Sequence, residues 1–173
     1  MAEPLCDAIL SKIREQIERT DHLVALVPDE QLNWVPGVTG AWSTAMVMGH
    51  LVECLAGICA VLAAAHPDEL LYFHKLRECQ DPSADVSTAR DRLTLYWRHI
   101  EEGFALLTDV ELARRVPTVF VEEGQSILSL LLNNLEHLTN HKHQLFIYLK
   151  LMGVNVASRD LYHFASSRTA TRS

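Results

Sequence analysis

The chain has 173 residues, of which 49% are hydrophobic and 21% charged, and its formal net charge is −7. These proportions predict one folded domain, and the lack of any Lys/Arg run argues against nucleic acid as a partner. The most apolar stretch, Cys54–Ala65, is too short to predict a membrane span. The N-terminus carries Glu3 and Asp7 without the basic start of a secretory signal, so we expect a cytoplasmic protein.

Four segments have helical periodicity, and they predict an all-α protein. The expected helices cover residues 5–27, 44–65, 87–107 and 126–152. Ser43 is an expected N-cap of the second helix, Pro67 its stop, and Gly153 the stop of the fourth. Amphipathic helices of about twenty residues without strand-rich stretches predict a four-helix bundle with long loops between helices.

The segments between the helices are less regular. Residues 70–73 suggest a short helical or packed turn, whereas residues 108–124 suggest a helical turn followed by an extended strand that returns at Gly124. Trp34 and Trp42 in the first loop are expected to close one end of the core, with stacking on a substrate as the alternative. We expect residues 1–153 to form the bundle domain and residues 154–173 a tail that packs as far as Phe164 and then frays.

The expected fourth helix carries two histidines with metal-ligand spacing. His137 and His141 are four residues apart, which places both imidazoles on one helix face. The glutamate of an HExxH motif is missing between them, so a zincin-type site is not predicted. His143 lies two residues beyond His141 and should point away from that face.

A third histidine, His50, lies on the apolar stripe of the expected second helix, between Val47 and Leu51. If this stripe packs against the fourth helix, His50, His137 and His141 meet in a three-histidine site with an open coordination position. The pattern leaves a metal site and a set of satisfied core histidines equally open. Three imidazoles without partners would be costly to bury, which favours the metal.

Glu53 lies three residues after His50, and it is the candidate catalytic residue. It is expected to act as a fourth ligand, to orient a bound water or an imidazole, or to lie at the edge of the stripe. Four cysteines, Cys6, Cys54, Cys59 and Cys79, form no CxxC pair, and reduced thiols are expected. Cys54 is the one cysteine whose position, four residues after His50, allows it to approach the site.

Two segments together resemble the DinB-like (DinB/YfiT) superfamily. WVPGVTGAWSTAMVMGHLVE, residues 34–53, is similar to its tryptophan-bearing loop and the His-Leu step that follows. HLTNHKHQLFIYLKLMG, residues 137–153, is similar to its HxxxH pair followed by Gln-Leu. The resemblance implies a four-helix bundle in which His50, His137 and His141 hold a divalent ion, most often nickel or zinc. The chain departs from the family pattern at Lys142-His143, where many members have Arg-Gly, and an altered helix surface beside the site is expected.

The resemblance also implies a range of functions. Relatives include transferases and isomerases that use low-molecular-weight thiols, so the leading hypothesis is a metal-dependent thiol transferase with a small-molecule substrate. A metal-dependent hydrolase, a non-catalytic metal-binding stress-response protein and a bare bundle remain as alternatives. No membrane partner is expected, and assembly as a homodimer stays open.

Overall fold

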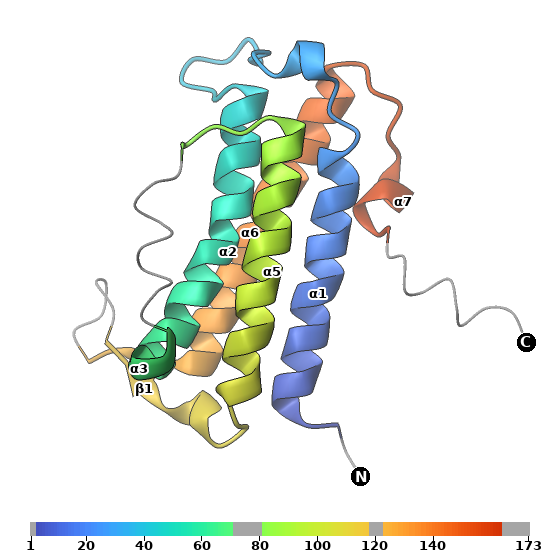
Figure 1. The fold of residues 1–173 in the computed structure, drawn as a ribbon. Helices are drawn as coiled ribbons and strands as arrows, with labels where there is room; N and C mark the ends of the chain where they lie inside the picture. The colour runs from blue at the N-terminus through green and yellow to red at the C-terminus, as the bar shows by residue number, and fades with distance from the viewer. Residues whose placement is uncertain (1–2, 71–80, 118–122, 164–173) are drawn as a thin grey trace, which may run out of the picture.

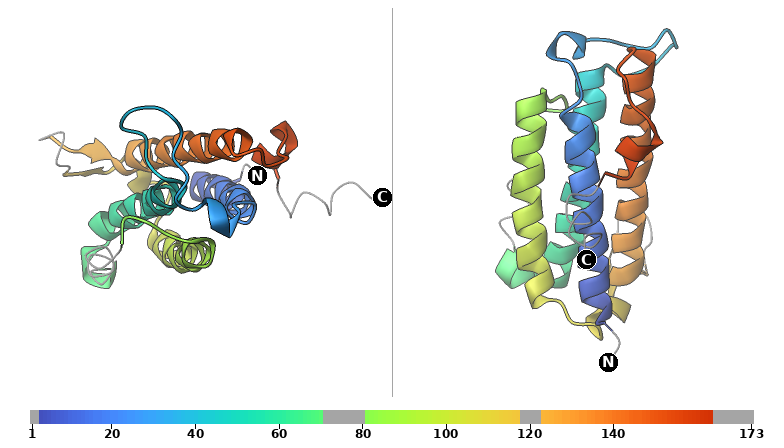
Figure 2. Two further views of the ribbon diagram at one scale, coloured as in Figure 1. Left: turned by 90° about the horizontal axis from the view of Figure 1, so that it is seen from above. Right: turned by 90° about the vertical axis from the view of Figure 1, so that its right-hand side faces the viewer.

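Four long helices lie side by side in the computed structural model, which describes residues 3–70, 81–117 and 123–163 (Figure 1). They are α1 (Leu5–Val24), α2 (Thr44–Ala65), α5 (Val86–Leu106) and α6 (Ile127–Leu151). Helices α1 and α6 run in one direction and α2 and α5 in the other (Figures 1 and 2). This arrangement confirms the all-α bundle, and the parallel course of α2 and α5 explains why a long connection is needed between them.

Short polar side chains begin three of the long helices. Ser43 Oγ accepts a hydrogen bond from the Met46 amide at 3.3 Å, which confirms the predicted cap of α2. Asp85 caps α5 in the same way through the Thr88 amide at 2.7 Å, and Ser126 caps α6 through the Ser129 amide at 3.1 Å. Each cap satisfies an amide that the helix itself leaves without a partner.

Helix α1 ends earlier than predicted. The apolar stripe continues to Val27, but the amides of Leu26 and Val27 bond to the carbonyls of Leu23 and Val24, three residues back. The final turn is therefore tighter than an α-helix, as is common at helix ends. Val27 is still buried, so the sequence pattern marked the buried face correctly and misplaced the helix boundary.

Helix α2 forms the centre of the core and packs most extensively against α6 and then α5. Its 22 residues make it long and apolar enough to cross a membrane, which the shorter apolar stretch seen in the sequence did not suggest. However, 67% of its most apolar window is buried inside the bundle. The apolar character of α2 is therefore explained by its contacts with the other helices.

Short elements connect the long helices. They are η1 (Asp29–Gln31), α3 (Pro67–Leu70), η2 (Glu111–Ala113), β1 (Arg115–Val116), β2 (Gln125–Ser126) and α7 (Ser158–Leu161). Strands β1 and β2 pair antiparallel, with Arg115 opposite Ser126. Gly124 has a φ of +72°, and a Cβ there would overlap the Val116 carbonyl, so the return of the chain requires glycine. The predicted helical turn and return are confirmed, whereas residues 118–122 and most of the predicted turn at 70–73 lie outside the described residues.

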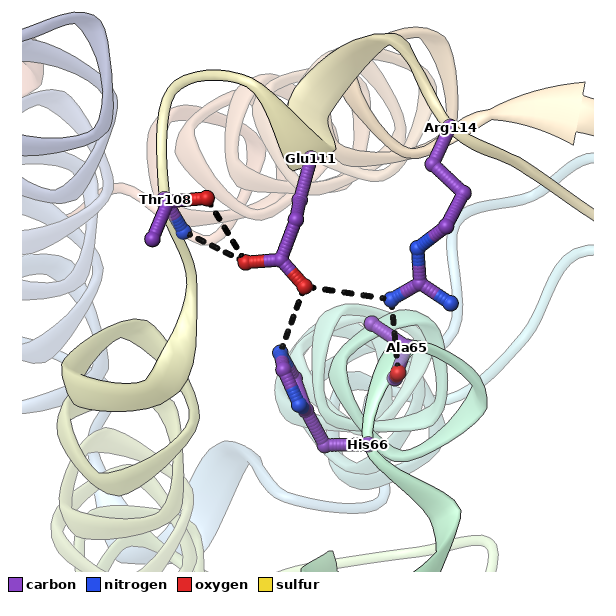
Figure 3. A network of polar contacts seen from close by, with 5 residues as sticks. All are labelled: Ala65, His66, Thr108, Glu111 and Arg114. Atoms are coloured by element: carbon purple, nitrogen blue, oxygen red, sulfur yellow. Dashed lines mark hydrogen bonds and ion pairs between the residues drawn. The ribbon is translucent and has the colours of Figure 1, made fainter.

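A polar network fastens the loop after α5 to the end of α2 (Figure 3). Glu111 accepts hydrogen bonds from the Thr108 amide and hydroxyl at 2.9 and 2.8 Å, and its other oxygen lies 3.6 Å from His66 Nε2. Arg114 donates to the Ala65 carbonyl at 2.6 Å, which satisfies an acceptor at the end of the helix. These hydrogen bonds close the end of the bundle at which α2 terminates.

The described part of the tail packs on α1. Leu161 of α7 is buried, and Asp160 lies 3.0 Å from His22 Nε2. The ring of His163 stacks on that of His22 with 4.1 Å between centroids. The tail is therefore attached to the bundle as far as residue 163, the last residue that the structure describes, and the predicted fraying beyond Phe164 stays a prediction.

Candidate metal centre

Helices α2 and α6 bring His50, His137 and His141 together, as the sequence pattern predicted. The Nε2 atoms of His137 and His141 are 3.0 Å apart, and those of His50 and His137 are 3.4 Å apart. The ring centroids of His50 and His141 are 4.4 Å apart. Three imidazoles from two helices therefore direct ring nitrogens toward one point.

The spacing of these nitrogens fits a single ion. Ligands at Zn–N bond lengths of about 2.05 Å in a tetrahedron lie about 3.3 Å from one another. The observed separations of 3.0 and 3.4 Å are close to this value. Three neutral imidazoles whose nitrogens face each other cannot all find hydrogen-bond donors among themselves, so a cation between them would satisfy all three.

Two features of the histidines favour the form that binds a metal. Gln144 Oε1 lies 2.8 Å from His141 Nδ1, which places the proton on Nδ1 and leaves the Nε2 lone pair toward the other rings. Burial lowers the pKa of His50 and of His137, and the neighbouring imidazoles lower both further. Both effects favour the neutral ring, which is the form that binds a metal.

The site lies at the margin of the core. The sequence pattern placed all three histidines on inward faces, but His137 is exposed and His50 and His141 are only partly buried. Their position follows from the true buried face of α6, which is centred on Leu131, Leu138, Lys142, Leu145 and Leu149. Exposure of His137 leaves one side of the centre open to solvent.

Cys54 adds a sulfur that the sequence marked as able to approach. Its Sγ and the ligand nitrogens of the three histidines all lie within 4.8 Å of one another. The side chain is buried, and burial raises the pKa of the thiol to about 12. His3Cys is therefore a possible donor set, with the sulfur on the core side and His137 on the solvent side.

Trp42 packs directly against the histidines and does not simply close the core. Its ring lies 5.0 Å from that of His50, edge to face, and is stacked 6.3 Å from that of His141. Its carbonyl accepts a hydrogen bond from Tyr148 at 3.1 Å, which connects the loop to α6. Trp34 is the residue that packs inward, edge-on to Tyr148. Trp42 thus forms a wall of the centre.

Glu53 is directed toward α5. Tyr96 donates a hydrogen bond of 2.8 Å to its carboxylate, and burial together with this bond raises the pKa of the Tyr96 phenol. Glu53 does not belong to the group of candidate ligand atoms found among the described residues. Its catalytic role stays a prediction, and the sequence offered no signal for Tyr96 as its partner.

The two residues that depart from the family pattern have different surroundings. His143 is exposed beside Phe146, as predicted from helix geometry. Lys142 was expected to alter the surface beside the site, yet it is only 4% exposed and donates a hydrogen bond to Gln16 Oε1 on α1. It faces α1, so its charge lies on the inner side of α6.

Comparisons with known proteins agree with this fold. The family model of the DinB superfamily matches residues 12–145. A DinB-like protein from Bacillus cereus is 16% identical with a TM-score of 0.69, over 91% of this chain and 99% of that one. The DinB-like protein YjoA from Bacillus subtilis is 17% identical with a TM-score of 0.65, over 84% and 92% of the two chains. At these identities the structures establish the fold alone, and no curated protein matched the sequence.

Proposed function

The chain belongs to the DinB superfamily, and on that premise we propose that it is a metal-dependent enzyme that activates a low-molecular-weight thiol for transfer. The observation that supports this most is the convergence of His50, His137 and His141 at the separations of ligands to one ion. Three imidazole ligands suit nickel or zinc better than calcium or magnesium. The free thiols of Cys6, Cys54 and Cys59 fit a reducing compartment, so we place the protein in the cytoplasm.

The residues around the centre fit a reaction that needs an open site. A bound divalent ion would lower the pKa of a thiol and so supply a thiolate at neutral pH. His141 is held in one tautomer by Gln144, and Trp42 covers the His50 and His141 rings from one side. Exposed His137 leaves the other side accessible. A substrate can therefore reach the centre without movement of the long helices.

Hydrolysis is less well supported. A metal-dependent hydrolase commonly needs a carboxylate or histidine that takes a proton from water. Glu53 is the carboxylate that the sequence offered for this task, but it accepts a hydrogen bond from Tyr96 and lies outside the group of candidate ligands. Activation of a thiol needs no such base once the ion has lowered its pKa.

One observation favours a second function. If the buried Cys54 binds the ion, the donor set is His3Cys, and four protein ligands leave no open position, as in structural zinc sites. The protein would then be a non-catalytic metal-binding protein. The position of Cys54 therefore makes it the residue that best separates the two functions.

A cobalt-substituted protein titrated with 2-mercaptoethanol tests the proposal. We expect a sulfur-to-cobalt charge-transfer band that appears on addition of the thiol and persists in Cys54→Ser. A band that is present before the thiol is added and is lost in Cys54→Ser would support the structural site. The absence of any band after thiol addition, with cobalt bound, would refute thiol activation.

A further inference from the structure

We propose that the thiol used at this centre has an uncharged, apolar body, which binds against Trp42 and Met46. This inference rests on the proposed function and adds the chemical class of the substrate. The inference is argued from the side chains beside the open side of the three histidines. It predicts that the centre prefers an aryl or alkyl thiol over anionic and zwitterionic thiols of similar size.

Trp42 gives the open side a flat apolar surface. Trp42 is 38% exposed although its ring packs against two of the three histidine rings. The backbone at Trp42 is held on both sides, because its carbonyl accepts a hydrogen bond from Tyr148 and the next residue, Ser43, caps α2. An exposed aromatic ring beside a reactive centre favours stacking with an apolar or aromatic group.

Met46 extends the same surface along α2. It precedes His50 by four residues, so the two side chains share a helix face. It is 39% exposed, which is unusual for a large apolar side chain in a helix otherwise rich in buried residues. A thioether adapts its shape to an apolar ligand at little cost, and Met is common at such binding surfaces.

Apart from the ion itself, which the thiolate sulfur would bind, the two described segments that carry the histidines offer no basic side chain to an anionic group on the body of the thiol. Residues 32–57 and 133–148, the two segments that build it, contain one Lys or Arg, which is Lys142. Lys142 is buried against Gln16 on α1 and cannot pair with a ligand at the open side. Glu136 is exposed next to His137 and would repel a carboxylate. Desolvation of a charged thiol here would therefore have no compensating ion pair from these segments.

The test compares thiols of different charge on the cobalt-substituted protein. Benzyl mercaptan, 2-mercaptoethanol, 3-mercaptopropionate and cysteamine are titrated, and the charge-transfer band gives each affinity, corrected for thiol ionisation. We expect benzyl mercaptan to bind about tenfold more tightly than 2-mercaptoethanol, which corresponds to about 1.4 kcal/mol. The 3-mercaptopropionate anion should bind most weakly. Benzyl alcohol should give no band, which shows that the sulfur is required.

Two variants assign the preference to the apolar surface. Met46→Gln retains the size of the side chain and should reduce the preference for benzyl mercaptan over 2-mercaptoethanol to about threefold. Trp42→Gln should act in the same direction, and Leu151→Gln, an exposed apolar position at the end of α6, should change nothing. The proposal is wrong if 3-mercaptopropionate binds as tightly as benzyl mercaptan, or if Met46→Gln leaves the preference intact. A failure of every thiol to give a band refutes the proposed function itself.

Discussion

The buried ammonium group of Lys142 should make a contribution to the stability of the protein that becomes more favourable as the pH rises. Its side chain is 4% exposed between α6 and α1, with Gln16 Oε1 as its hydrogen-bond acceptor. Burial, together with the charge of Arg19, lowers the pKa of Lys142 from its ordinary 10.5 to about 8. The unfolded chain therefore binds the proton more tightly than the folded one between these two values. The contribution of Lys142 to the unfolding free energy therefore increases with pH across this window.

The magnitude follows from the two pKa values. The pKa of Lys142 is 10.5 in the unfolded chain and about 8 in the folded one. Once the pH exceeds both values, the unfolding free energy has gained about 3 kcal/mol relative to low pH. About 2 kcal/mol of this change in unfolding free energy falls between pH 7 and 9.5. Screening of the charge by nearby solvent reduces the expected change to about 1 kcal/mol. Lys142→Met removes this gain with pH. It also leaves the side-chain oxygen Oε1 of Gln16 without its donor, which costs a similar amount at every pH.

Urea unfolding of the metal-free protein at pH 7 and pH 9.5 measures the effect. The difference in unfolding free energy between the native chain and Lys142→Met should grow by about 1 kcal/mol over this interval. Lys150→Met, an exposed position on the same helix, is the matched control and should show no such change. The comparison is made between variants because burial raises the pKa of Cys6, Cys54 and Cys59, which lowers the stability of all variants alike above pH 9. A difference that stays constant with pH would refute the reasoning.

Four further predictions concern the centre and its support. Elemental analysis of protein purified without a nickel column should find about one divalent ion per chain, and no metal together with no uptake of zinc or nickel would contradict the site. His137→Ala and His141→Ala should each weaken metal binding at least about a hundredfold in a competition titration, whereas exposed His143→Ala should not; equal losses would mean that the three-histidine assignment is wrong. Metal affinity should be nearly constant from pH 8 to 6.5 and fall at lower pH, because burial lowers the pKa of His137 below its ordinary 6.5; a tenfold loss by pH 6.5 would argue against this. Gly57→Ala should not raise the unfolding free energy of the native chain, because the new Cβ would overlap Asn134 Oδ1. In an Asn134→Ala background the same change should raise it by about 1 kcal/mol. Equal effects in both backgrounds, measured by urea unfolding, would exclude this contact.

The sequence predicted the helices well because their ends carry local signals. Ser43 and Pro67 bound α2 at the predicted residues, and the prediction for α6 differs from the structure by one residue at each end. The topology was harder to predict. Periodicity identifies helices but not their relative directions, so the parallel course of α2 and α5 had no signature in the sequence.

The sequence predicted which histidines come together but not how deeply they are buried. The sequence pattern placed His137 and His141 on an inward face of the fourth helix, and Lys142 was expected to alter the helix surface beside the site. The structure buries Lys142 at the middle of the helix contact and leaves His137 exposed. A lysine in the core is too rare for a pattern of residue types to predict. The same limit applies to Glu53, since only the packing of α5 against α2 shows that Tyr96 is its partner.

The ligands come from two helices that are far apart along the chain. His50 and His137 are separated by 87 residues, and neither α1 nor α5 contributes a candidate ligand. An ion at this point would therefore act as a removable cross-link that closes about half of the chain, including α5, into one loop. For a permanent bond, closing a loop of this length corresponds to about 4–5 kcal/mol of chain entropy. With the ion in place, amide hydrogens of α2 and α6 should exchange last, whereas α1 and α5 can separate from the bundle first.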